Sequence, residues 1–161
     1  MERKIDQYEI EARREKEQSD VARARAHISR YKKMLPYVRQ LENDIEVLTS
    51  KIEKSTQMPR GMVVQSNPLM TIDDLILRLT DLRGQYEKEW AVAESVCNAI
   101  EIIINRIPEV KGQEMDKKVL KKHYIAEKKL YEIAGEEKYS DSSIDLFVRR
   151  GLLKYAKVMN L

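Results

Sequence analysis

Apolar residues in the segment 34–52 recur at alternating steps of four and three, which is the period of a coiled-coil seam. The seam consists of Met34, Val38, Leu41, Ile45, Leu48 and Ile52. Residues at this period share one side of an α-helix, so the segment predicts a helix that buries one stripe against another helix. Pro36, near the start, is expected to open this helix or to kink a longer one.

A second seam follows and is longer. It consists of Ile72, Leu75, Leu79, Leu82, Tyr86, Trp90, Ala93, Cys97, Ile100, Ile104 and Ile107, with one extra step at Trp90 that is typical of a stutter. Pro59, Gly61 and Pro68 exclude a continuous helix between the seams, and a loop is predicted at about 55–70. Thr71 with Asp74 three residues later resembles a capping box for the second helix. Trp90 and Cys97 are expected in the core.

The two seams predict an antiparallel helical hairpin. Because the second helix is the longer one, its far half has no partner in the hairpin. This half could pack on residues 1–33, on the C-terminal segment or on a second copy of the chain. Residues 1–33 have few apolar side chains among many Arg and Glu, which favours a solvated helix.

Pro108 is expected to end the second helix and to mark a domain boundary. The predicted fold class is all-α, with a long helical hairpin or coiled coil followed by a helix-turn-helix domain of three to four helices. Residues 1–107 form the first predicted domain, with a role in dimerisation or partner binding, and residues 108–161 form the second. A homodimer or higher oligomer through the coiled coil is expected.

The composition argues against several classes of protein. Charged residues make up 35% of the chain and only five residues are Gly, which favours amphipathic helices over sheets. The only two histidines, His27 and His123, lie far apart, and Cys97 is the only cysteine, so neither a metal site nor a disulfide is predicted. No glycines have the spacing of a phosphate-binding loop. We therefore expect no catalysis and no cofactor.

No apolar run reaches the roughly 18 to 20 residues that cross a bilayer. The N-terminal residues are charged throughout and lack the apolar stretch of a signal peptide. The sequence thus predicts a soluble, cytoplasmic protein without membrane contacts.

Residues 129–157 have the pattern of a helix-turn-helix. Ile133 and Ala134 supply an apolar anchor and a small residue for the helix crossing, and Tyr139 is expected to fill the turn. Ser140 has the character of an N-cap, and Ile144 with Phe147 is expected to hold the second helix against the core. A preceding helix is predicted at about 114–125, with Met115, Val119, Leu120, His123 and Tyr124 on one side.

If this module binds DNA, its outward residues divide into two sets. The candidates for contacts with base edges are Ser142, Ser143, Asp145 and Leu146. The candidates for contacts with phosphates are Arg149, Arg150, Lys154, Lys117, Lys118, Lys121 and Lys122. The four lysines of 117–122 form two doublets four residues apart and share a helix face, which fits a solvated surface equally well.

The stretch "LYEIAGEEKYSDSSIDLFVRRGLLKYAK" resembles the region-four helix-turn-helix of sigma factors. It is more similar to small phage late-gene transcriptional regulators of the ArpU and RinA type. The matching features are "HYI" at 123–125, "YS" at 139–140 and "RRGL" at 149–152, where that family has "RRAL". The "QMPRG" at 57–61 also resembles a loop of some members. The resemblance implies a sequence-specific DNA-binding regulator, an activator of phage or prophage genes that works with host RNA polymerase in the bacterial cytoplasm.

The chain departs from that pattern at three places. Glu137 stands where the family has a buried Leu, and Lys138 stands where Gly is frequent. Asp141 and Asp145 lie on a helix face that is usually basic or amide-rich. These departures favour the alternative function, a helical protein-interaction factor, such as an antirepressor or a polymerase-binding protein, that does not read DNA.

Overall fold

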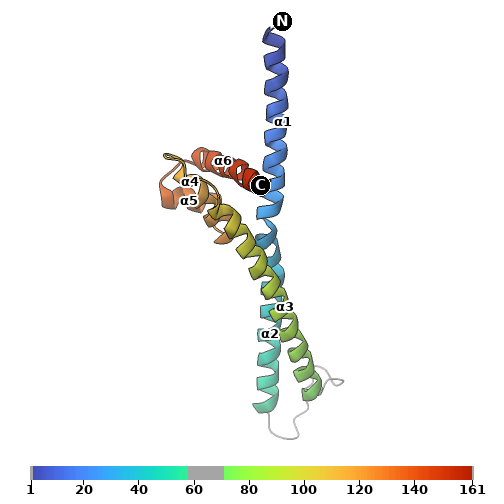
Figure 1. Cartoon of the computed structure of the whole chain (residues 1–161). Coiled ribbons are helices and arrows are strands. Elements are labelled where there is room, and N and C mark those ends of the chain that lie inside the picture. Colours follow the sequence, from blue (N-terminus) through green and yellow to red (C-terminus); the bar gives the residue numbers. More distant parts are fainter. Residues whose placement is uncertain (1, 58–70, 161) are drawn as a thin grey trace. The chain divides into compact units, whose positions relative to one another are not determined.

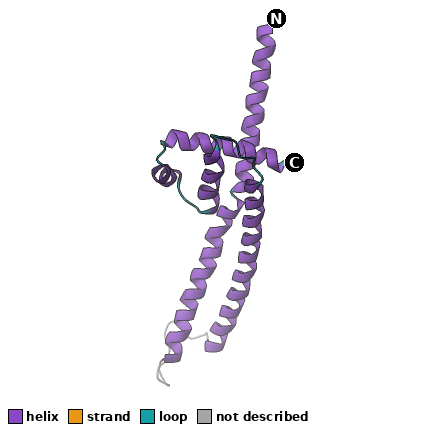
Figure 2. Ribbon diagram, turned by 60° about the vertical axis from the view of Figure 1, so that its left-hand side comes forward, coloured by secondary structure: helices purple, strands orange, loops and turns teal. Residues whose placement is uncertain are grey.

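The computed structural model describes residues 2–57 and 71–160, with the side chains from residue 7 onward. All elements within these ranges are helical (Figures 1 and 2), which confirms the all-α fold class. The elements are α1 (Glu2–Ile28), α2 (Arg30–Gln57), α3 (Ile72–Asn105), α4 (Glu114–Leu120), η1 (Lys121–Ile125), α5 (Leu130–Glu137) and α6 (Asp141–Met159). The helix breakers expected in the loop, Pro59, Gly61 and Pro68, lie outside the described residues. No described helix has the length and apolarity needed to cross a membrane.

The first two helices follow each other with a break at a single residue, Ser29. Its N–H donates to the Arg25 carbonyl at 3.1 Å, and its own carbonyl accepts from the Lys33 N–H at 3.0 Å, so backbone hydrogen bonding continues across the break. Pro36 lies inside α2. Of the two expected alternatives, the opening of the helix by Pro36 is excluded, because α2 already begins at Arg30 and Pro36 lies within the longer helix.

Residues 34–94 form one of two compact units, and within it α2 and α3 run side by side as the predicted hairpin (Figures 1 and 2). On α2, Val38, Leu41 and Leu48 are buried, and the Tyr37 hydroxyl accepts from Gln85 Nε2 on α3 at 2.8 Å. The expected capping box opens α3: the Thr71 N–H donates to Asp74 Oδ2 at 3.1 Å, and Thr71 Oγ1 accepts from the Asp74 N–H at 3.2 Å. These three features confirm the hairpin.

Two residues of the second predicted seam are not in the core. Ile72, the first residue of α3, is 42% exposed, and Trp90 is 40% exposed. Trp90 is the stutter position, where the extra step carries the side chain to the edge of the contact face, and a two-helix hairpin is too thin to enclose an indole there. Cys97, also expected in the core, is half-buried.

The second unit combines residues 1–33 with residues 95–161. Its core joins α1 (Ala24, Ile28) and the end of α3 (Ile100, Ile104) to helices α4 to α6. The far half of the long helix thus packs on both the N-terminal helix and the C-terminal segment, two of the three expected alternatives. The predicted boundary at residue 108 falls inside this unit, and the contacts group the N-terminal helix with the C-terminal module.

Helix α1 is only partly packed. Ala24 and Ile28 are fully buried, and His27 Nδ1 lies 2.8 Å from the Tyr155 hydroxyl on α6. The N-terminal half of α1 projects beyond α6 (Figure 1), and residues 7–16 are all exposed. The expected solvated helix is thus found in this half, whereas the last two turns of α1 belong to the core.

Helix α4 continues without a break into η1, a turn of π-helix, which matches the single helix predicted at 114–125. Val119, Leu120 and Tyr124 on its predicted apolar side are buried. The helix crosses α6 closely at Gly151, where a Cβ would lie 3.0 Å from Leu120 Cγ and 3.1 Å from the Asp116 carbonyl oxygen. The absence of a side chain at 151 therefore sets the approach of these two helices.

Candidate functional site

Helices α5 and α6 are joined by a three-residue turn, Lys138 to Ser140. Lys138 ends α5 in the left-handed conformation, with φ 59° and ψ 43°, and the Tyr139 N–H donates to the Ala134 carbonyl at 3.1 Å. A left-handed residue is what turns the chain sharply at the end of a helix, and Gly adopts it at the least cost. Lys138 adopts this conformation at the position where the helix-turn-helix pattern frequently has Gly.

The start of α6 is capped as expected. Ser140 is the N-cap residue, and its Oγ accepts from the Ser143 N–H at 3.2 Å. On the core side, Ile133, Ala134 and Ile144 are buried, which confirms the predicted anchor. Tyr139 is 44% exposed and packs at a right angle against Phe147, with ring centroids 5.0 Å apart, so it covers the turn rather than filling it.

The outward face of α6 carries the residues predicted to contact bases. Ser142, Asp145 and Leu146 are exposed, the last to 55%, whereas Ser143 is half-buried and lies beside the Ser140 hydroxyl at 2.9 Å. Arg149 is exposed on the same face. Within the part of the chain that the structure describes, Arg149 has no hydrogen-bond or ion-pair partner. Its guanidinium is therefore available to a ligand.

Two of the predicted phosphate contacts instead face the interior. Arg150 donates from Nε and Nη2 to the two carboxylate oxygens of Asp116, at 2.7 and 2.8 Å. Lys154 Nζ donates to Asp116 Oδ2 at 2.7 Å and to Gln113 Oε1 at 2.6 Å. The Asp116 side chain is 1% exposed, and hydrogen bonding to it raises the pKa of Arg150. These cations link α4 to α6.

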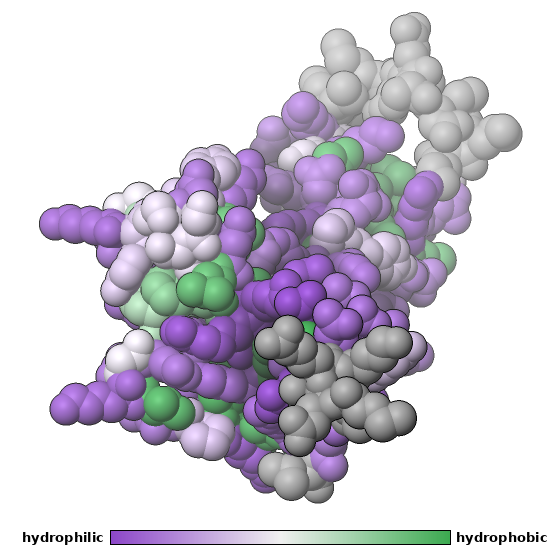
Figure 3. Space-filling view, turned by 90° about the horizontal axis from the view of Figure 1, so that it is seen from above, coloured by the Kyte–Doolittle hydropathy of each residue, from purple (hydrophilic) through white to green (hydrophobic). Residues whose placement is uncertain are grey.

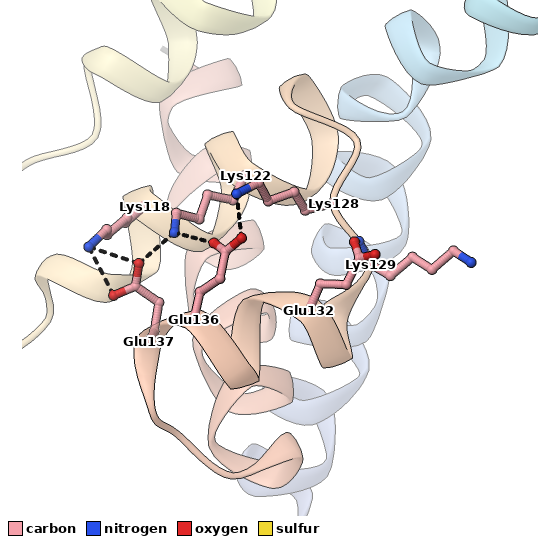
Figure 4. Close-up of polar contacts among 7 residues, drawn as sticks. All are labelled: Lys118, Lys122, Lys128, Lys129, Glu132, Glu136 and Glu137. Carbon is pink, nitrogen blue, oxygen red and sulfur yellow. Dashed lines mark hydrogen bonds and ion pairs between the residues drawn. The ribbon is translucent and has the colours of Figure 1, made fainter.

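The four lysines of 117–122 also separate into groups. Lys118 and Lys122 point toward α5 and pair with Glu137 at 2.9 and 2.6 Å (Figure 4). Lys122 also pairs with Glu136, at 2.8 Å. Lys117 donates to the Asn105 carbonyl at 3.3 Å. Only Lys121 is exposed without a partner among the described residues.

The contacts of Glu137 show how the structure accommodates this departure from the helix-turn-helix pattern. Its side chain is 14% exposed, although the family has an apolar Leu at this position. Hydrogen bonds from Lys122 and Lys118 lower the pKa of Glu137, and those from Lys122 and Lys128 lower the pKa of Glu136 to about 2. An ion-pair cluster thus joins α5 to the preceding helix, where a Leu would do so by apolar contact.

Asp116 was not predicted as a functional or structural residue, although the sequence carries a signal for it. Asp116 shares a helix face with Val119, Leu120 and His123, at steps of three and four. A carboxylate on an apolar face needs a cation when buried, and Arg150 and Lys154, four residues apart, could have been assigned to it.

The face of the molecule in Figure 3 is largely hydrophilic, with apolar side chains in small patches. Among the described residues no group of His, Cys, Asp and Glu has the arrangement of a metal site. No family model, curated protein or solved structure matches this chain. The arrangement of α5, the turn and α6 is therefore the feature from which a function can be argued.

Proposed function

We propose that the chain is a sequence-specific DNA-binding transcription regulator that docks α6 in the major groove. The observation that carries the proposal is the geometry of α6. It starts at a serine cap after a three-residue turn that begins at the left-handed Lys138. Its first two turns are exposed on one side, and its other side is anchored by Ile144. A helix held in this way can enter a groove with its N-terminal residues against base edges.

The proposed contacts with DNA are of two kinds, to base edges and to phosphates. Ser142 can donate to or accept from a base edge, Asp145 can accept from a cytosine amino group, and Leu146 can contact a thymine methyl group. Of the predicted phosphate contacts, Arg149 on the same face and Lys121 at the start of η1 are exposed and available for phosphates. Arg150 and Lys154 contribute by fixing α6 on α4 rather than by touching phosphate.

The resemblance to phage late-gene regulators of the ArpU and RinA type supports a more specific proposal. The chain would be an activator of phage or prophage genes that acts with host RNA polymerase in the bacterial cytoplasm. The residues 34–94 would then serve for dimerisation or for contact with polymerase.

The second candidate function is a protein-interaction factor that does not read DNA. It is favoured by the exposed leucine on α6, 55% accessible between Ser142 and Arg149, and by the acidic residues 141 and 145 beside it. Carboxylates on this face repel phosphate, whereas an apolar side chain flanked by charges suits a protein surface.

Fluorescence anisotropy on labelled fragments tiled across the surrounding genome, at two salt concentrations with competitor DNA, separates the two functions. The proposal predicts tight binding to one fragment that persists at the higher salt. It also predicts that Arg149→Ala weakens binding to every fragment and lowers the salt slope by about one. Lys54→Ala, which removes a cation from the hairpin, is the control. Weak, uniform binding that vanishes with salt would favour the protein partner, with RNA polymerase as the first bait.

A further inference from the structure

A shallow groove of about 280 Å³ lies between α2 and α3 within the unit 34–94. Its floor is apolar and is formed by Val47, Leu48, Leu75 and Leu82. Val47 is 56% exposed, which is unusual for a Val in the middle of a helix that packs on another. The groove is therefore an apolar strip that the hairpin itself does not cover.

The seam beneath the groove is also incompletely buried. On α2, Ile45 and Ile52 are only half-buried, and on α3 the same holds for Leu75 and Leu82. Two helices bury one stripe each, and the outer edges of that stripe remain in contact with water unless further helices cover them. The apolar pattern of this unit is thus that of a bundle with more than two helices.

Three charged residues line the groove, Asp44 and Lys51 on α2 and Arg78 on α3. Asp44 and Lys51 are seven residues apart on α2, so both lie on the same side of that helix. Val47 lies between them. If a second α2 packs antiparallel with a twofold axis near Val47, Asp44 lies beside Lys51 of the partner subunit, and the reverse pair forms at the other end. A surface with acid and base placed symmetrically about an apolar centre is complementary to itself.

We propose that this groove is the interface of a homodimer, in which α2 of each copy packs antiparallel across α2 of the other to give a four-helix bundle. Val47 contacts its twofold equivalent, and two Asp44–Lys51 pairs set the register. A parallel arrangement would place like charges opposite each other and is disfavoured. The inference is independent of DNA binding, because it involves neither α6 nor the lysines near it.

Charge reversal tests the register directly. Asp44→Lys alone places two lysines together at each end of the interface, and Lys51→Asp alone places two acids together. Each single variant is expected to associate at least tenfold more weakly than the original chain, in sedimentation velocity over a range of protein concentrations. The double variant D44K/K51D restores both pairs in exchanged positions and should regain dimerisation. An equimolar mixture of the two single variants should form a heterodimer, because all of its pairs are then complementary.

The controls use positions on other faces of the same helices. Glu46→Lys makes the same charge change as Asp44→Lys on the exposed side of α2, and Leu77→Ser removes a 65% exposed apolar residue from α3 outside the groove. Both should leave the dimer intact, whereas Val47→Ser should weaken it. Helical content by circular dichroism should be the same in all variants. A monomeric chain at all concentrations would overturn the proposal, and so would a dimer that the single reversals do not weaken.

Discussion

Replacing Asp116 by Asn tests whether Arg150 and Lys154 serve the fold. The Asp116 side chain is 1% exposed and accepts three hydrogen bonds from the two cations, which are themselves 31% and 18% exposed. Asparagine keeps the shape but leaves two positive charges without a carboxylate. Removing one partner of a buried ion pair costs about 3–5 kcal/mol, and because both cations retain some contact with water we expect about 2–4 kcal/mol here.

The effect on melting follows from the size of the unit. For a unit of about 100 residues, 1 kcal/mol corresponds to a shift of roughly 4–8 °C, so the midpoint should fall by roughly 10–30 °C. Differential scanning calorimetry of the full chain measures it. Asp145→Asn is the matched control, since Asp145 is exposed on α6 and its loss should change stability by about 0.5 kcal/mol or less.

A second variant tests whether the loss of stability in Asp116→Asn comes from the unpaired charges rather than from altered packing. The triple variant with Asp116→Leu, Arg150→Met and Lys154→Met replaces the ion-pair cluster by apolar side chains, and such replacements are frequently neutral or stabilising. It should recover most of the loss. If Asp116→Asn has the same melting midpoint as the Asp145→Asn control, the cluster of Asp116, Arg150 and Lys154 does not stabilise the fold. Arg150 is then again a candidate for phosphate contact.

Three further predictions follow from the N-terminal helix and the ion-pair cluster. Ile28→Ala should destabilise the C-terminal module by about 2–5 kcal/mol, because Ile28 is fully buried in its core, whereas Ile10→Ala, at a 50% exposed position of α1, should not change its urea midpoint. Burial, and secondarily Arg30, lowers the pKa of His27, so stability should be full above about pH 6.5 and fall as the pH drops below it; the fall should be smaller in His27→Gln. Glu137→Gln frees Lys118 from its carboxylate and leaves Lys122 paired with Glu136 alone, so binding to non-specific DNA should tighten and its salt slope should become steeper. An unchanged slope would mean that these lysines do not face DNA.

Much of the hairpin could be predicted because its pattern is local. The seam of α2 places Leu41 and Leu48 on one side, and the structure buries both. Position along the seam does not report how much of a side chain a two-helix hairpin can enclose at a stutter, which is why Trp90 was expected in the core and is 40% exposed. The membership of α1 in the second unit was beyond such reasoning. Ala24 and Ile28 are the only buried side chains among the described residues of α1, and two apolar residues four apart also occur on solvated helices.

The positions of the helices and of the cap in the helix-turn-helix could be predicted from the sequence, but the partners of its charged side chains could not. The Ser140 cap depends on residues within one turn of it, and this prediction is confirmed. The partners of the charged side chains depend on which helices cross. Arg150 and Arg149 are neighbours with identical chemistry, yet one lies on Asp116, 34 residues away, and the other faces solvent. Only the packing of α4 on α6 distinguishes them.

The discontinuous second unit also constrains how the chain is made. Ile28 leaves the ribosome well before Leu152 and Tyr155 of the same core exist. At about 5–20 residues per second, the intervening stretch takes roughly 6–25 s to synthesise. The hairpin needs only contacts between neighbouring helices and can fold during that interval, whereas Ala24 and Ile28 remain exposed to the cell throughout it. Helix α6 therefore completes a core that α1 began, and a premature stop codon in α6 would leave α1 unprotected as well.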